Sequence, residues 1–309
     1  MIHTIEFFMF VPVYQIDTRK FIQYDKENGL HHYSKGINFS YNFKHWTLTV
    51  KTTAEAVIGR TDITINDYAE YADKLTKIVS EVVERDVHIE ELKISRIDYK
   101  VDIPLTDEEM KIFKQIKDKH YINYKYMSQK VQYDTSVHLK SPKGYGQCVL
   151  NSYSKFNECM EIKYFNVWRV EIEVFKSKIR KNLINYGISR ELSNYWTINS
   201  FNENYFELLK GYYFLGDYYR LDVARNKIRH SDYSKTIKDN LCKFVTRINR
   251  YGMTGVKGKY YNYVTMKKYC ELLDNIDVNP VTIDIGSNVT YMENILKKCK
   301  RIVEEKYFV

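Results

Sequence analysis

Apolar and polar residues alternate with a period of two in several short segments of the first 175 positions. We predict β-strands at residues 37–42, 46–52, 94–103, 135–140, 147–154 and 168–175. Apolar residues spaced three and four apart predict a helix over 65–86, and the capping-box sequence Thr106-Asp107-Glu108-Glu109 predicts the start of another. After about residue 179 the pattern is mostly helical. These elements predict an α+β fold: a mainly antiparallel sheet with helices packed on one face, followed by a helix-rich basic region.

The length of 309 residues suits one large domain or two modest ones. We expect a boundary between 180 and 200, with a first domain at 1–190 and a helix-rich second region at 191–309. The longest apolar run near the start, 7–13, is far shorter than the roughly 20 residues that span a bilayer, so we expect no membrane association. Five cysteines without a C-x-x-C pair favour the reduced thiols of a cytoplasmic protein.

The positive charge is concentrated in one segment of the chain. The formal net charge is +9, and residues 220–270 hold 13 Lys and Arg against three acidic residues. Seven aromatic residues are interleaved with these cations. Such a segment is typical of a surface that binds a polyanion, with rings that stack on bases, although a solvated helix face is the simpler alternative.

Two of the predicted strands carry charged residues at alternate positions. On the first strand these residues are Arg96, Asp98, Lys100 and Asp102, and on the second they are Arg169, Glu171 and Glu173. If the two faces adjoin, Asp98 and Glu171 would form an oxygen-rich pocket suited to Mg²⁺ or Mn²⁺, and the guanidinium groups could hold phosphate oxygens. The equally weighted alternative is a pair of solvated strand faces joined by cross-strand ion pairs.

Three motifs in this order resemble a known family. They are Ser95-Arg96-Ile97-Asp98, then Ser152-Tyr153-Ser154-Lys155 with Glu158, then Trp168-Arg169-Val170-Glu171, preceded by His32-Tyr33-Ser34 and Val57-Ile58-Gly59. The set resembles the gene II/X-type replication initiators of filamentous phages and related phage and plasmid elements, over roughly residues 30–190. The C-terminal third resembles the family only loosely, and other rolling-circle initiators and conjugative relaxases are similar more weakly.

The resemblance implies a metal-dependent tyrosine endonuclease and strand transferase. Such initiators have a nicking-endonuclease-like fold and cut one strand of a double-stranded origin through a 5′-phosphotyrosine. They later rejoin the displaced strand. Tyr153 matches the nucleophile, and we expect Lys155, on the same strand face, to supply a cation that assists the phenol. We expect Arg96 and Arg169 to complete the catalytic set, and Asp98, Glu171 and Glu158 to bind Mg²⁺ or Mn²⁺.

One feature of better-known nucleases with this mechanism is missing from the sequence. No His-hydrophobe-His triplet is present, so metal binding is expected to rest largely on carboxylates. His31 and His32 are adjacent and would point to opposite sides of a strand. His138, on the strand predicted to pair with that of Tyr153, is the histidine to test.

The resemblance also implies partners and a location. The expected partners are double-stranded origin DNA and the displaced single strand, together with a host helicase or polymerase, in the cytoplasm of a bacterial host cell. In the basic segment we expect DNA contacts from Arg220, Arg225, Arg229, Lys243, Arg247, Arg250, Lys257 and Lys259. A mobilisation relaxase with the same chemistry, or a non-catalytic origin-binding protein, are the alternatives.

Overall fold

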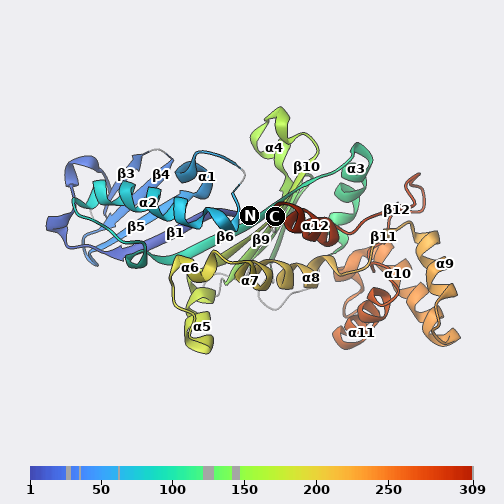
Figure 1. Ribbon diagram of the computed structural model, residues 1–309. Coiled ribbons are helices and arrows are strands. Elements are labelled where there is room, and N and C mark those ends of the chain that lie inside the picture. The colour runs from blue at the N-terminus through green and yellow to red at the C-terminus, as the bar shows by residue number, and fades with distance from the viewer. Residues whose placement is uncertain (26–28, 35, 62, 121–128, 141–146, 308–309) are drawn as a thin grey trace. The chain divides into compact units, whose positions relative to one another are not determined.

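The computed structural model describes residues 1–25, 29–34, 36–61, 63–120, 129–140 and 147–307. The fold is α+β with antiparallel strand pairing, as the sequence predicts (Figure 1). The chain divides into two compact units. The first unit comprises Met1–Lys100, Lys143–Cys148 and Glu171–Asn204, and the second comprises Val101–Pro142, Val149–Val170 and Tyr205–Val309.

The first unit is built on a sheet with the strand order β2-β3-β4-β5-β1-β6-β10. The strands are β1 (Ile2–Phe10), β2 (Ile22–Asp25), β3 (Gly29–Ser34), β4 (Ile37–Asn42), β5 (Thr47–Thr53), β6 (Lys93–Pro104) and β10 (Val167–Phe175). The strands predicted at 37–42, 46–52, 94–103 and 168–175 are therefore confirmed. Strand β1 was not predicted, because its outward positions include Phe8 and Phe10 and the residues from Phe7 onward form an unbroken apolar run.

Helices cover one face of this sheet, and polar side chains occupy the other. The helices of the first unit are α1 (Ala54–Ile58), α2 (Tyr68–Val83), α5 (Lys176–Tyr186), α6 (Leu192–Tyr195) and α7 (Ile198–Phe201), with short 3₁₀ turns at Val13–Gln15, Thr18–Lys20, Ile65–Asp67 and Ile89–Glu91. Helix α1 contacts β1, β5 and α2 (Figure 1). Strand residues buried on the helix side include Phe39, Tyr41, Leu48 and Val50. Their neighbours along each strand, such as Asn38 and Thr49, carry the polar face.

The second unit contains a sheet with the order β6-β10-β9-β8-β7, a two-stranded sheet, and most of the helices. Its further strands are β7 (Gln129–Tyr133), β8 (Ser136–Lys140), β9 (Cys148–Ser154), β11 (Tyr218–Tyr219) and β12 (Tyr291–Met292). Its helices are α3 (Asp107–Ile116), α4 (Lys155–Cys159), α8 (Glu207–Tyr213), α9 (Leu221–His230), α10 (Lys235–Val256), α11 (Tyr263–Asp274) and α12 (Ile295–Tyr307), with 3₁₀ turns at Lys117–Lys119 and Ile162–Tyr164. A π-helical turn at Asn202–Phe206 precedes α8. The predicted hairpin of β8 and β9 is confirmed by its register; its connection, 141–146, lies outside the described residues.

Buried tyrosines hold the second unit together through their hydroxyl groups. The Ser152 hydroxyl accepts from the Trp168 indole at 2.8 Å and lies 2.6 Å from the hydroxyl of Tyr213. The imidazole of His120 lies 2.9 Å from the hydroxyl of Tyr218. Much of the unusual tyrosine content is therefore structural, because a buried phenol contributes apolar area and still satisfies its polar atom.

The division into units differs from the boundary that we expected near 190. Residues 101–142 and 149–170 were expected in the first domain but belong to the second unit, which also holds the C-terminal helices. Lys298 of α12, for example, pairs with Glu109 of α3 at 2.7 Å. Contacts between segments so distant in sequence produce no local sequence pattern, so the sequence did not predict this division. In the part of the chain that the structure describes, every helix is too short or too polar to cross a membrane.

Candidate functional site

A cluster of ionisable side chains lies where β6 and β10 meet in the first unit. Arg96 donates from Nε and Nη2 to the two carboxylate oxygens of Asp98, at 2.8 and 2.7 Å. The same guanidinium lies 3.0 Å from the Glu173 carboxylate on β10. The side chain of Asp98 is fully buried and Glu173 is mostly buried. Of the alternative with two solvated strand faces, the cross-strand ion pair is present between Arg96 and Glu173, but these faces are buried rather than solvated. The metal pocket stays a prediction.

A histidine that sequence reasoning missed belongs to this cluster. Nδ1 of His3 on β1 lies 3.2 Å from a carboxylate oxygen of Glu171, which is itself buried. The register of β1 against β6 shifts between Ile2 and Ile5, and such a bulge changes where a side chain points. Strict alternation along residues 2–10 would have placed His3 on the face opposite to Glu6, because alternation does not record the bulge.

Burial dominates the electrostatics of Asp98. Desolvation raises the pKa of Asp98 to about 7, and the nearby carboxylates of Glu171 and Glu173 raise it further, while Arg96 opposes them. The carboxyl is therefore near half-protonation at neutral pH. Strongly shifted carboxyl groups of this kind are more frequent at functional sites than elsewhere.

The donor atoms in the cluster are of the kind that Mg²⁺ and Mn²⁺ bind. Carboxylates of Asp98 and Glu171 and the imidazole of His3 come from three neighbouring strands, and hard divalent cations favour the carboxylate oxygens among these donors. Among the described residues, however, no three His, Cys, Asp or Glu side chains are arranged so that they could hold a metal ion. Both oxygens of Asp98 are hydrogen-bonded to Arg96. The chemistry of the donors fits a divalent ion, and the assignment of Asp98, Glu171 and Glu158 as ligands stays a prediction.

Tyr153 lies on β9 in the second unit. It stands opposite Ser136 of β8, and it is half-buried, between the buried residues Ser152 and Ser154. Its ring thus lies on the more open side of the strand, as a nucleophile requires. That Tyr153 meets the cluster around Asp98 stays a prediction.

Lys155 and Glu158 do not lie where we expected. Strand β9 ends at Ser154, and Lys155 is the first residue of α4, so the expectation that it shares a strand face with Tyr153 is wrong. A helix start changes the direction of the side chain from that of a continuing strand. The Lys155 ammonium pairs with Glu158 and lies 5.4 Å from the centre of the Tyr164 ring. Its charge is therefore partly neutralised, as is that of Glu158.

Arg169 forms a buried ion pair in the second unit. Its Nε and Nη2 lie 2.5 and 2.7 Å from the two carboxylate oxygens of Asp102 on β6. The Arg169 side chain is only 2% exposed. The pair repeats the bidentate geometry of Arg96 and Asp98.

His138 is held by its neighbours on the β8–β9 hairpin. Its Nδ1 lies 2.8 Å from the side-chain oxygen of Asn151, and its Nε2 lies 3.1 Å from the hydroxyl of Ser136. Both ring nitrogens are therefore engaged in hydrogen bonds. This favours a positioning role on the strand that faces Tyr153 over a role as a metal ligand.

Four of the predicted DNA-binding cations line one groove between α9 and α10 of the second unit. Arg225, Arg229, Lys243 and Arg247 surround a volume of about 400 Å³, together with Asp239. None of the four cations forms an ion pair within the described ranges. The buried Nε of Arg225 also has no hydrogen-bond partner there. Uncompensated cations around a concave surface attract an anion.

The other predicted cations have different surroundings. Arg220 is neutralised by Asp222, at 2.7 Å. Tyr251 and Tyr260 stack on each other, with ring centres 5.7 Å apart. The remaining cations lie over these and nearby rings, at distances measured to the ring centre: Arg250 lies 5.2 Å from Tyr251, Lys259 5.4 Å from Tyr260 and Lys257 5.7 Å from Tyr263. Arg247 of the groove also lies 4.5 Å from the centre of the Tyr260 ring. In this cluster the rings hold cations in place, rather than offering open faces to bases.

A scan against protein-family models gives no match, and a search of curated proteins finds no relative.

Proposed function

We propose that this protein is a rolling-circle replication initiator that nicks one strand of its double-stranded origin and later rejoins the displaced strand. The observation that carries the proposal is the buried cluster of Arg96, Asp98, Glu171, Glu173 and His3. An ion pair buried in this way adds little net stability, because desolvation of the charges offsets their attraction. Three carboxylates crowded around one guanidinium are better explained by catalysis than by folding.

The proposed chemistry begins at the hydroxyl of Tyr153. The hydroxyl loses its proton to the solvent as its oxygen attacks a phosphorus atom of the DNA backbone, the bond from phosphorus to the 3′ oxygen breaks, and the departing 3′ oxygen takes up a proton from the solvent, so that protons balance. The phosphotyrosine bond conserves the energy of the phosphodiester, so the reverse reaction rejoins the strand without ATP. A Mg²⁺ or Mn²⁺ ion would supply polarisation of the phosphate, with the carboxylate oxygens of Asp98 and Glu171 among its ligands.

The basic groove supports the proposal because its charge suits the proposed substrate, DNA. The groove of Arg225, Arg229, Lys243 and Arg247 is suited to phosphate oxygens of the DNA backbone, and these contacts carry no sequence information. We infer that the groove anchors DNA while the sheet carries out the chemistry. Host helicase or polymerase contacts and a bacterial cytoplasmic location belong to the same proposal.

A nicking assay tests the role of Tyr153. Supercoiled DNA that carries the protein's own origin is incubated with Mg²⁺ or Mn²⁺ and either wild-type protein or Tyr153→Phe. We expect nicked DNA covalently attached to the wild type alone. Tyr133→Phe, which changes an exposed tyrosine of β7, is the matched control and should nick like the wild type. Equal nicking by wild type and Tyr153→Phe would exclude Tyr153 as the nucleophile, and no nicking by either would favour a non-catalytic origin-binding protein.

A second assay separates chemistry from binding. Asp98→Asn and Glu171→Gln keep the size of each side chain and remove its charge. We expect both variants to lose cleavage and to retain DNA affinity in a gel-shift experiment, because neither residue belongs to the basic groove. Loss of affinity in a folded variant would instead assign the cluster to DNA positioning.

A further inference from the structure

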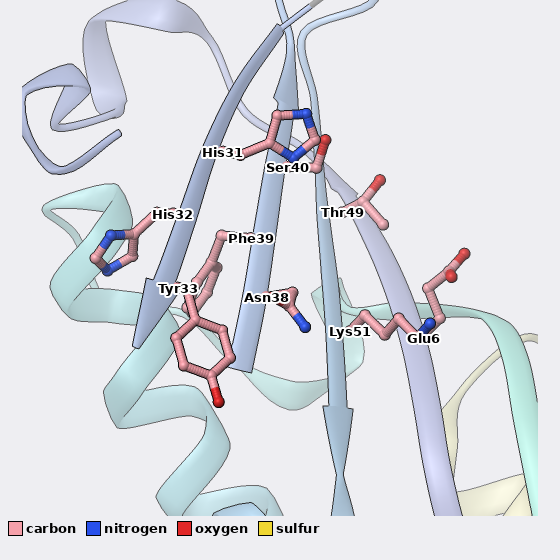
Figure 2. Close-up of a pocket in the computed structure, with 9 residues that line it drawn as sticks. All are labelled: Glu6, His31, His32, Tyr33, Asn38, Phe39, Ser40, Thr49 and Lys51. Atoms are coloured by element: carbon pink, nitrogen blue, oxygen red, sulfur yellow. The ribbon is translucent and has the colours of Figure 1, made fainter. Parts of the chain in front are cut away.

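A second concave surface lies on the polar face of the sheet in the first unit (Figure 2). It encloses about 400 Å³ over strands β3, β4, β5 and β1. The polar side chains stand in two rows that cross the strands (Figure 2). One row is His31, Ser40 and Thr49, and the other is Tyr33, Asn38, Lys51 and Glu6.

The second row leads directly to the acidic cluster. Lys51 is opposite Glu6 in the strand register, and Glu6 is opposite Arg96. Neighbouring strands lie about 4.8 Å apart, so the Lys51 backbone is about 10 Å from that of Arg96. The Glu6 carboxylate accepts a hydrogen bond from the Ser95 hydroxyl at 2.7 Å. This bond holds the Glu6 side chain between the pocket and the cluster. The pocket therefore lies about two strand spacings from Arg96 of the cluster, within the same unit.

The side chains of this pocket are poised for a ligand. In the ranges that the structure covers, Asn38, Ser40, Thr49 and Lys51 make no side-chain hydrogen bond or ion pair. The side chain of Tyr33 is 68% exposed and contacts no other ring among those described. An exposed aromatic ring beside unpaired amide, hydroxyl and ammonium groups matches the parts of a nucleotide: a flat base, its polar edge and a phosphate.

We propose that this pocket binds one nucleotide of single-stranded DNA. Tyr33 stacks on the base, the Asn38 amide donates to and accepts from its edge, and the Lys51 ammonium meets a phosphate. Duplex DNA does not satisfy the pocket, because the faces of paired bases are covered by their neighbours in the stack. Any role of the bound nucleotide in cleavage rests on the proposed function. The binding of the nucleotide to the pocket does not depend on that function.

Fluorescence anisotropy with a labelled oligothymidylate tests the proposal, with an abasic oligonucleotide of equal length as the second probe. All proteins carry Tyr153→Phe, so that no probe is cut. We expect Tyr33→Ala to weaken oligothymidylate binding about 5- to 100-fold and to leave abasic binding unchanged, since base stacking is lost. Tyr33→Phe keeps the ring and should retain affinity. Tyr14→Ala removes another exposed tyrosine of the same unit, outside the pocket, and should also retain affinity.

The dependence of oligonucleotide affinity on salt concentration distinguishes the stacking contact of Tyr33 from the phosphate contact of Lys51. Tyr33→Ala should leave the slope of log affinity against log salt unchanged, whereas Lys51→Gln should reduce it by about 0.7, as expected for one phosphate contact on a single strand. Affinities of Tyr33→Ala and Asn38→Ala within twofold of the parent would overturn the proposal. If Tyr33→Ala weakens binding while the wild type fails to nick origin DNA, the nucleotide site stands and the replication function falls.

Discussion

At the scale of single residues, Asp98 is the group with the clearest pH signature. An exposed aspartate ionises near 3.8, while burial moves the pKa of Asp98 to about 7. Between these values the folded protein holds a proton that the unfolded chain has lost, so the free energy of unfolding falls as pH rises from about 4 to about 7. We expect this fall to be smaller in Asp98→Asn. Urea unfolding across that interval measures the difference, and parallel profiles for the two proteins would contradict the shifted pKa.

The Arg169–Asp102 pair gives a prediction about stability. Asp102→Ala leaves the buried Arg169 guanidinium without its bidentate partner, and we expect a loss of about 3 kcal/mol in the free energy of unfolding. Asp73→Ala breaks the exposed pair with Lys77 on α2 and should cost less than about 0.5 kcal/mol. Denaturant melts of the two variants test the contrast, and equal losses would show that burial does not set the energy of these pairs.

The sequence predicted the surroundings of some site residues and not of others. Alternation put Arg96 and Asp98 on one strand face, and the structure pairs them. His3 was not predicted as a site residue, because a bulge in β1 brings it to Glu171 and no local sequence pattern records that bulge. Lys155 was misplaced because the end of β9 at Ser154 depends on the helix that follows.

At the scale of elements, the capping box of α3 sets the start of that helix. The Thr106 hydroxyl accepts from the Glu109 amide at 3.1 Å, and the Glu109 carboxylate accepts from the Thr106 amide at 3.0 Å. We expect Thr106→Ala to lower the free energy of unfolding by about 1 kcal/mol. Thr106→Ser keeps the hydroxyl and should remain within a few tenths of a kcal/mol of the wild type in the same urea titration. A similar loss in both variants would mean that the threonine methyl group, not the cap, stabilises the helix.

Elements were predictable where one face is polar and the other apolar. Strands β4 and β5 follow that rule, with Phe39 and Val50 buried and Asn38 and Lys51 exposed. Strand β1 breaks the rule, because aromatic side chains stand on both of its faces. A strand of that kind cannot be separated by periodicity from any other apolar run.

At the scale of the whole molecule, the local excess of positive charge predicts how DNA affinity responds to salt. The double variant Arg229→Gln/Lys243→Gln removes two cations from the groove between α9 and α10. We expect the slope of log affinity against log salt for duplex DNA to fall by about 1.8, and to do so for any sequence. Lys267→Gln/Lys268→Gln, on α11 and outside the groove, removes the same charge and should change the slope less. An equal change in both double variants would assign the effect to net charge alone.

The fold class followed from the pattern of elements, but the organisation of the molecule did not. Local patterns report which face of an element is buried, not which distant segment buries it. Such distant segments form the hydrogen bonds of Ser152 with Trp168 and Tyr213. They also form the ion pair between Glu109 and Lys298. This is why the expected boundary at 190 and the observed units differ.

Strands β6 and β10 each begin in one unit and end in the other. At these two strands the polypeptide passes from one unit to the other within regular secondary structure. No single cut in the backbone yields either unit intact, so the two cannot be exchanged among proteins as separate modules. Any recombination that replaces one unit of this chain must carry both strands with it, and with them Arg96, Asp98, Arg169 and Glu171.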